Sequence, residues 1–370
     1  MISKAPGTSP ACLVKLSHSM PVGNGKSEFF VRCFVRFPLY VLASASSLLG
    51  AVSSGEAATL SATDLLKQFN LITKGDVTGS AGFHVDGRVL VGGDYKVELG
   101  SVVYMNGKGD ASDFDEFVVK GRVDAQVHVN GGGNAAVGQG LDKLNMNGGG
   151  SKSAYAEGSA PSGHVQALSN YAGDLASMAA STTGIVRQGS VHDLTNTYNI
   201  SGLLNGIGVL SLTEADIRAD RDFVFNLGSD VDWVVVNVRA TEADKTFRLG
   251  STFKAQQGGS TASKVLWNFI GFEDVIFDAQ FSAGAILADG SRVTTTAGNI
   301  EGSVFSDRFH GLSELHFTGL GDGPLPGDEV QQPAPVPLPA GMPLLLSGFG
   351  LLRYWAQRRK RPVYCPPKAL

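Results

Sequence analysis

Among the residues that could do chemistry in this 370-residue chain, the 34 Asp and Glu outnumber the 30 Lys and Arg. Asp110, Asp113, Asp115 and Glu116 lie within seven residues, and carboxylate oxygens on a flexible loop are ligands that Ca²⁺ prefers. Their spacing fits neither the EF-hand loop nor the Gly-Gly-x-Gly-x-Asp nonapeptide repeat. Asp also outnumbers Glu, as is usual where Asp caps turns. The pattern favours a solvated acidic surface and leaves calcium at this cluster as the alternative.

Catalytic motifs are absent from the sequence. It has no Gly-x-Ser-x-Gly nucleophile elbow, no His-Glu-x-x-His zinc motif and no Gly-x-x-x-x-Gly-Lys-Ser/Thr phosphate loop. The histidines are scattered. His310 and His316 are the pair that could meet across one turn of the chain, although a surface position explains each of them as well. We therefore predict a protein that is not an enzyme and has no resident cofactor, with calcium as the exception.

The charge of the chain argues against a nucleic-acid partner. Residues 58–340 contain 19 Lys and Arg against 32 Asp and Glu, a net charge of −13. Binding to phosphates needs a basic face, which this composition does not provide. The cysteines, Cys12, Cys33 and Cys365, all lie outside this stretch. Neither disulfides nor thiolate metal sites can therefore stabilise it.

The elements that must position these residues are short strands separated by some of the 48 glycines. Apolar and polar residues alternate from Phe117 to Asn130, which is typical of a half-buried strand. The similar segments that begin at Gly284 and Gly302 lie eighteen residues apart, about one turn of a solenoid. An apolar stripe over residues 164–183 indicates a helix. The sequence predicts a mainly β protein, an irregular right-handed β-helix or solenoid with one long flanking α-helix, and a β-sandwich is the alternative.

Several segments resemble the choice-of-anchor A family, a bacterial exported domain that occurs with varied C-terminal anchors. They are Phe69–Ile72, Gly75–Val77, Val85–Asp94, Val265–Phe269, Gly284–Ala288, Gly298–Val304 and Glu314–His316. The chain departs from that family where Asp289 and Gly290 replace its usual Ala-Pro-Asn-Ala. The resemblance implies a choice-of-anchor A-like β-helical domain over residues 58–328, with a role as a surface adhesin or matrix component. The distal segments also resemble bacterial ice-binding domains.

Two ligand classes can be weighed from the residues. Ice binding would want a flat threonine array, and the candidates are Thr294-Thr295-Thr296 and the pair Thr195 and Thr197, without a regular repeat. Polysaccharide binding would want exposed aromatic side chains. Trp233 and Trp267 have apolar neighbours and are predicted to lie in the core, which leaves Tyr155 and Tyr198.

The N-terminal residues 1–57 have the pattern of a secretory signal peptide. Basic residues precede an apolar stretch from Phe37 to Val52, and small residues follow it. Cleavage by signal peptidase after Ala57 fits best. The long basic region makes Met20 an alternative start to Met1.

The C-terminal residues resemble a VPLPA-type sorting signal, a relative of the PEP-CTERM signals. A Pro-rich linker, residues 329–340, ends in the motif Val336, Pro337, Leu338, Pro339 and Ala340. An apolar segment, residues 341–356, is predicted to cross the membrane, and a cytoplasmic tail, residues 357–370, follows it. The tail begins with a basic cluster: Arg358, Arg359, Lys360 and Arg361. The resemblance implies cleavage by an exosortase-like protease.

These signals and the acidic body predict an exported protein, first held at the inner membrane and then placed on the cell surface or released. We expect a non-enzymatic adhesin or extracellular-matrix protein. A glycan-binding or ice-binding module is the alternative. The partners expected outside the cell are extracellular polysaccharide or further copies of the chain.

Overall fold

The computed structural model describes residues 59–321, apart from 99, 105–107, 189–194, 218–221, 251 and 257–261. These residues belong to one compact unit, Gly55–Leu370. The predicted signal peptide with Ala57, the sorting motif, the apolar segment 341–356 and the basic tail lie outside the described residues. In the part of the chain that is described, no helix is both long enough and apolar enough to cross a membrane.

Strands one turn apart pair in parallel, so the chain winds as a three-sided solenoid. On the first side, β1 (Phe69–Thr73) pairs with β3 (Arg88–Val91), and Leu71 lies opposite Val89. On the second side, β2 (Val77–Gly79) pairs with β4 (Tyr95–Val97). On the third, His84 bridges to Val102 of β5 (Ser101–Val103). Parallel ladders on three sides exclude the β-sandwich, and the right-handed sense of winding stays a prediction.

We call the three sides face A, face B and face C, and each is defined by the ladder of parallel strands that forms it. Face A contains β1 and β3 with β6 (Phe117–Arg122), β8 (Ala135–Gln139), β10 (Lys152–Ala154), β13 (Ile207–Thr213), β15 (Trp233–Arg239) and β18 (Val265–Ile270). Face B contains β2 and β4 with β16 (Thr246–Leu249) and β19 (Asp274–Phe277).

Face C contains β5 with β7 (Val127–Val129), β9 (Leu144–Met146), β12 (Thr195–Ile200), β14 (Asp222–Leu227), β17 (Phe253–Gln256) and β22 (Leu315–His316). The long strands β20 (Phe281–Thr295) and β21 (Ile300–Gly311) bend through all three faces. One strand departs from the parallel pattern, because β11 (Ile185–Gln188) is antiparallel to β12.

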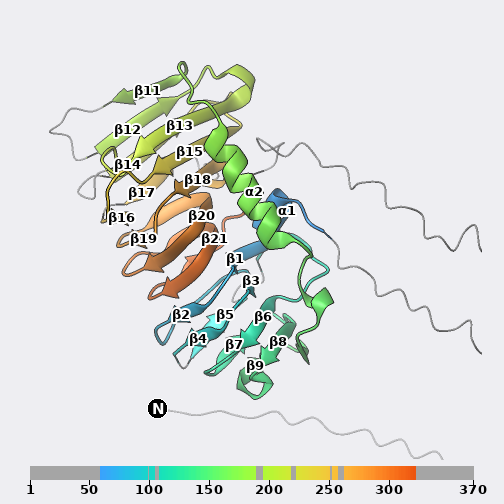
Figure 1. Ribbon diagram of the computed structural model, residues 1–370. Helices are drawn as coiled ribbons and strands as arrows, with labels where there is room; N and C mark the ends of the chain where they lie inside the picture. The colour runs from blue at the N-terminus through green and yellow to red at the C-terminus, as the bar shows by residue number, and fades with distance from the viewer. Residues whose placement is uncertain are drawn as a thin grey trace, which may run out of the picture. The chain divides into compact units, whose positions relative to one another are not determined.

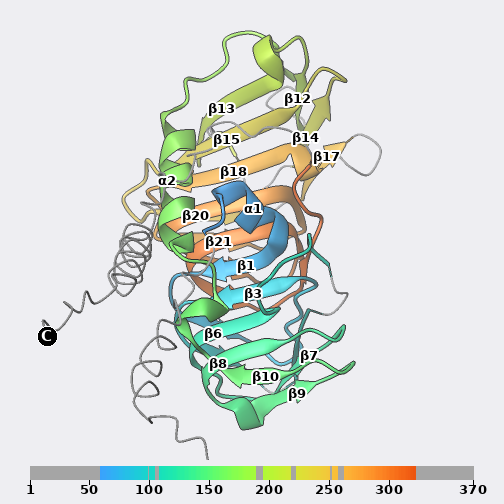
Figure 2. The same ribbon diagram turned by 90° about the vertical axis from the view of Figure 1, so that its right-hand side faces the viewer.

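The described part of the chain, residues 59–321, begins and ends in the middle of the stack. From β1 it winds outward to β10, and α2 (His164–Ser177) then returns it along face A, where it packs against β15, β18 and β20 (Figure 2). From β11 at the far end it winds back to β21, which pairs in parallel with β1 (Figure 1). The two halves of the solenoid therefore join at the β1–β21 seam.

The predicted eighteen-residue turn is confirmed in register, because Ala285 lies opposite Ser303. Two predicted boundaries were wrong. The segment Phe117–Asn130 is not one strand, because it turns a corner after β6 and resumes as β7 on another face. The predicted helix 164–183 ends at Ser177, where Met178 adopts an extended backbone. Ser181 then donates its backbone N–H to the Val209 carbonyl at 2.9 Å, so the chain has already joined face A.

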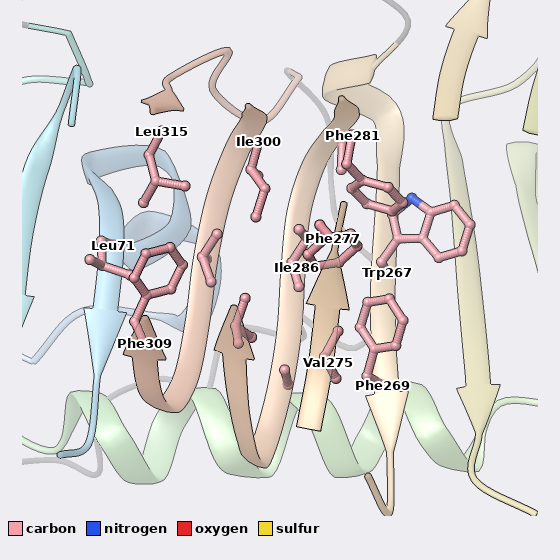
Figure 3. Packing of buried hydrophobic residues seen from close by; sticks show 14 of the residues in the cluster. Leu71, Trp267, Phe269, Val275, Phe277, Phe281, Ile286, Ile300, Phe309 and Leu315 are labelled. Carbon is pink, nitrogen blue, oxygen red and sulfur yellow. The ribbon is translucent and has the colours of Figure 1, made fainter. Parts of the chain in front are cut away.

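Two apolar layers hold the fold together. The first fills the interior of the solenoid, where Figure 3 shows Trp267 beside Phe269. Trp267 stacks on Phe225 and Phe269 with ring centroids 6.0 and 6.1 Å away. The second lies between face A and the helices, α2 and the short α1 (Ala62–Gln68), and contains Trp233. Both tryptophans are fully buried, which confirms the predicted core positions and removes them as exposed ligand contacts.

Candidate functional site

Face A is occupied by the helices. Buried side chains on its strands donate to backbone carbonyls of α2: Asn237 to Leu175 at 2.7 Å and Asn268 to Ala172 at 2.9 Å. Ser303 likewise donates to the Leu66 carbonyl of α1. These helices therefore cover the middle of face A, over β1, β15, β18, β20 and β21, and ligands have access to the outward side chains of faces B and C.

Face C carries a polar array in register. Its first column of outward side chains runs across neighbouring strands: Asn145, His128, Val102, His84, Glu314, Asn299 and Gln280. A second column lies beside it: Asn147, Asn130, Tyr104, Asp86, His316, Glu301 and Ser282. Of these, Asp86 is buried and pairs with Lys108 at 3.0 Å. Amide, imidazole, carboxylate and hydroxyl groups dominate both columns. Such a surface offers donors and acceptors at the strand spacing of about 4.8 Å.

The centre of face C joins the two halves of the chain. His316 on β22 contacts Asp86 from the first turn at 3.4 Å and Glu314 at 3.0 Å. Glu314 also lies 3.3 Å from Nδ1 of His84. Asn299 bonds to His316 at 3.1 Å. The last strand is therefore held against the first turn by two imidazoles between two carboxylates.

The flanks of face C are tied by side-chain hydrogen bonds between adjacent strands. Asn147 donates to Asn130 at 2.8 Å, and Asn145 pairs with His128 at 3.0 Å. On the other side, Glu301 accepts from Gln280 and Ser282, each at 2.6 Å. Because neighbouring side chains fix each other's orientation, the array presents its polar atoms with reduced freedom.

Tyr104 is a half-exposed aromatic side chain that sequence reasoning missed. Its backbone has a positive φ of 53°, and its ring lies against Gly131 and Gly133, where a side-chain Cβ would meet it at 3.3 and 2.6 Å. Of the two predicted tyrosines, Tyr198 is buried and Tyr155 is half-buried. The sequence feature that could have indicated an exposed aromatic here is a tyrosine at a strand end near two glycines, which is a weak signal.

Face B has a mixed surface bordered by ion pairs. Its central column in register comprises Arg248, Ile276, Thr294, His310, Thr78 and Lys96. His310 bonds to Thr78 at 2.8 Å, so the predicted pair of His310 and His316 is separated onto faces B and C. Lys96 bridges Asp76 at 2.7 Å and Asp94 at 3.1 Å.

The threonine run 294–296 does not form the flat threonine array that ice binding would need. Thr294 points outward, whereas the side chain of Thr295 is fully buried and does not reach the surface. In the central column of face B, His310 separates Thr294 from Thr78, and charged side chains stand at both ends. Within the described residues these columns form no repeated threonine ladder.

The predicted calcium cluster is only partly drawn together. Asp110 and Asp113 are exposed, whereas Glu116 accepts from the Asn134 backbone at 2.6 Å and from Arg88 at 3.4 Å. Burial, with the nearby Glu116 charge, raises the pKa of Asp115. Among the residues described, no group of three or more His, Cys, Asp or Glu side chains could hold a metal ion. Calcium at this cluster stays a prediction.

One family model covers most of the described chain. The model of a family described as "Putative Ice-binding-like adhesive domain" matches residues 62–317. A search of curated proteins finds no match.

Among solved structures, an ice-binding protein from an Antarctic biological consortium is 14% identical, with 70% of this chain and 90% of that chain covered and a TM-score of 0.31. The ice-binding protein of the ascomycete Antarctomyces psychrotrophicus is 12% identical, with 72% and 100% covered and a TM-score of 0.27. The DUF3494 domain of Shewanella frigidimarina ice-binding protein_1 is 13% identical, with 72% and 100% covered and a TM-score of 0.29.

Proposed function

Since the chain belongs to the family of ice-binding-like adhesive domains, we propose that it is a non-enzymatic adhesive domain that binds extracellular polysaccharide at the cell surface. The choice-of-anchor A resemblance supports the same class of role. Export would follow from the signal peptide, residues 1–57, removed by signal peptidase after Ala57. The VPLPA motif, residues 336–340, would then be read by an exosortase-like protease while residues 341–356 hold the chain in the inner membrane.

The observation that carries this proposal is the polar array of face C. A polysaccharide presents hydroxyl groups at regular intervals, and the array presents amides, imidazoles and carboxylates in register along the stack. Each contact is weak, since a net hydrogen bond contributes only about 0.5–1.5 kcal/mol. Repetition along a polymer multiplies such contacts into useful avidity. Tyr104, whose ring centroid lies 5.5 Å from the Arg88 guanidinium, adds a half-exposed aromatic side chain to the second column.

A binding assay with a face C variant tests the proposal. The triple variant N130A/H128A/N145A removes three outward side chains without touching a buried residue. The control Q166A/N170A removes an exposed hydrogen-bonded amide pair from α2. In affinity electrophoresis through gels containing neutral polysaccharides, we expect the triple variant to lose at least about tenfold in affinity, from about 0.5–1.5 kcal/mol per contact. Equal retardation of the triple variant and the control would refute the face C assignment.

Two further arms of that assay address the alternatives. Adding a chelator should leave polysaccharide binding unchanged if face C acts alone. Loss of binding in the chelator would instead assign polysaccharide binding to calcium near Asp110–Glu116. Sedimentation at rising protein concentration measures self-association, which would replace polysaccharide as the partner if it accounted for retention.

Ice binding is the second candidate, favoured by the family description. The interrupted column of face B argues against it, because His310, Arg248 and Lys96 break the run of small side chains. We expect no thermal hysteresis at millimolar protein. A measurable freezing hysteresis that T294A or T78A abolishes would make ice the ligand.

The export route has its own measurement. Intact mass of the protein recovered from cell-surface and medium fractions should match a chain from about Ala58 to near Ala340. A full-length species confined to the cytoplasm would contradict both signals.

A further inference from the structure

Among the described residues of face B, Arg308 is a cation without an ion-pair partner. Arg292 pairs with Asp274 at 2.7 Å, Arg248 pairs with Asp278, and Lys96 pairs with Asp76. Arg308 is exposed on the same face. Among the described residues, no carboxylate lies within ion-pair distance of its guanidinium.

The neighbours of Arg308 make this unpaired charge costly. Arg292 lies directly opposite it on β20, and like charges opposite each other on adjacent strands destabilise a sheet. The acidic neighbours are already engaged. Asp76 accepts from Lys96 and from the Asp94 backbone at 2.9 Å, and Asp307 pairs with Lys74 at 3.0 Å. Asp274 already offsets the charge of Arg292, so the counter-charge that is lacking belongs beside Arg308.

The side chains around Arg308 complete a small donor set. His310 lies two residues further along β21 and also points outward, and Thr294 lies opposite His310. The stem of Arg308 rests beside Gly75, where an added Cβ would lie 3.5 Å from its Cγ. Guanidinium, imidazole and hydroxyl groups thus share one patch.

We propose that Arg308, with Arg292 and His310, binds a carboxylate of an acidic, uronate-containing polysaccharide. The planar fork of arginine matches a carboxylate with two parallel hydrogen bonds. Asp274 and Asp76 flank the patch, so a singly charged group meets less repulsion than a phosphate or a sulfate cluster. This inference rests on the proposed adhesive function and names the class of polymer bound. It places the acidic polymer on face B, whereas neutral polysaccharide is proposed to bind face C.

The test compares R308Q with the control K143Q, which removes one exposed positive charge from the turn before β9. Binding to polygalacturonate, to its fully methyl-esterified form and to dextran sulfate is measured by biolayer interferometry with EDTA present. We expect R308Q to weaken polygalacturonate binding about tenfold and K143Q to weaken it less than twofold. Methyl esterification of the polymer should weaken binding of the native protein by about the same factor as R308Q does.

Each other outcome has a definite meaning. The proposed carboxylate site is refuted if R308Q binds polygalacturonate as tightly as the native protein does. It is also refuted if the native protein binds dextran sulfate more tightly than polygalacturonate. If R308Q keeps its affinity for neutral polysaccharide while losing the acidic polymer, both proposals stand. If the native protein binds no polysaccharide at all, the proposed function itself fails. A thermal melt of R308Q confirms that the exposed substitution leaves the fold intact.

Discussion

The hydrogen bonds between face A and α2 make a quantitative prediction about Asn268. Its side-chain amide donates to the Ala172 carbonyl and to Oδ1 of Asn237, each at 2.9 Å, and both asparagines are 1% exposed. The variant N268L keeps the volume but leaves Asn237 Oδ1 without its donor in an apolar layer. It also removes a partner of the helix carbonyl.

The expected cost follows from those two groups. A buried acceptor left unpaired costs about 1–3 kcal/mol, so N268L should lower the free energy of unfolding by about 2–4 kcal/mol. The double variant N237L/N268L removes donor and acceptor together, and it should cost less than the sum of the single variants. Urea unfolding followed by tryptophan fluorescence measures all three, since Trp233 and Trp267 are buried.

A matched control exists on face C. Asn226 donates to Asn199 at 2.8 Å across the same kind of parallel register, but both side chains are half-exposed. Water can replace the lost partner there, so N226L should cost less than about 1 kcal/mol. Equal losses for N226L and N268L, or a loss below 0.5 kcal/mol for N268L, would refute the reasoning from burial.

Three other predictions concern packing and pH. G302A should cost at least about 2 kcal/mol in urea unfolding, because φ at Gly302 is 150° and a Cβ would lie 2.1 Å from the Ala283 carbonyl oxygen; a loss within error would contradict it. W267A should cost about 3–5 kcal/mol in the same assay, as an emptied core site does, and W267F less. The hydrogen bond from Lys96, with that from the Asp94 backbone, lowers the pKa of Asp76, so its contribution to stability is present above about pH 4 and is lost as pH falls further. D76N should therefore show a smaller drop in melting temperature between pH 6 and pH 3 than the native protein, and an equal drop would remove Asp76 from the acid response.

Local patterns predicted the solenoid because each turn repeats the same physical demand. Inward positions must be apolar and corners must tolerate tight backbone approach, so Gly302 and Ile286 mark their turns in the sequence. The corner after β6 was missed because alternation continues through it: Val123 is buried on one face and Val127 on the next. Period-two alternation reports which residues point inward, not which face they belong to.

The candidate site was harder to predict than the fold. Asn145 and His128 are ordinary polar residues until the register places them side by side, and the sequence distance between His84 and His316 conceals their shared cluster. Searching for acidic groups by sequence proximity found Asp110–Glu116 instead, because proximity along the chain is the only proximity that a sequence displays.

The winding order gives the polar array of face C a particular dependence on complete folding. Its centre combines His84 and Asp86 from the first turn with Glu314 and His316 from the last, and β22 fills the position between β21 and the first turn. These side chains come together only when both halves have wound and the β1–β21 seam has closed. A partly folded chain would expose the seam but would not present the array, so closure of the solenoid and formation of the binding surface are one event.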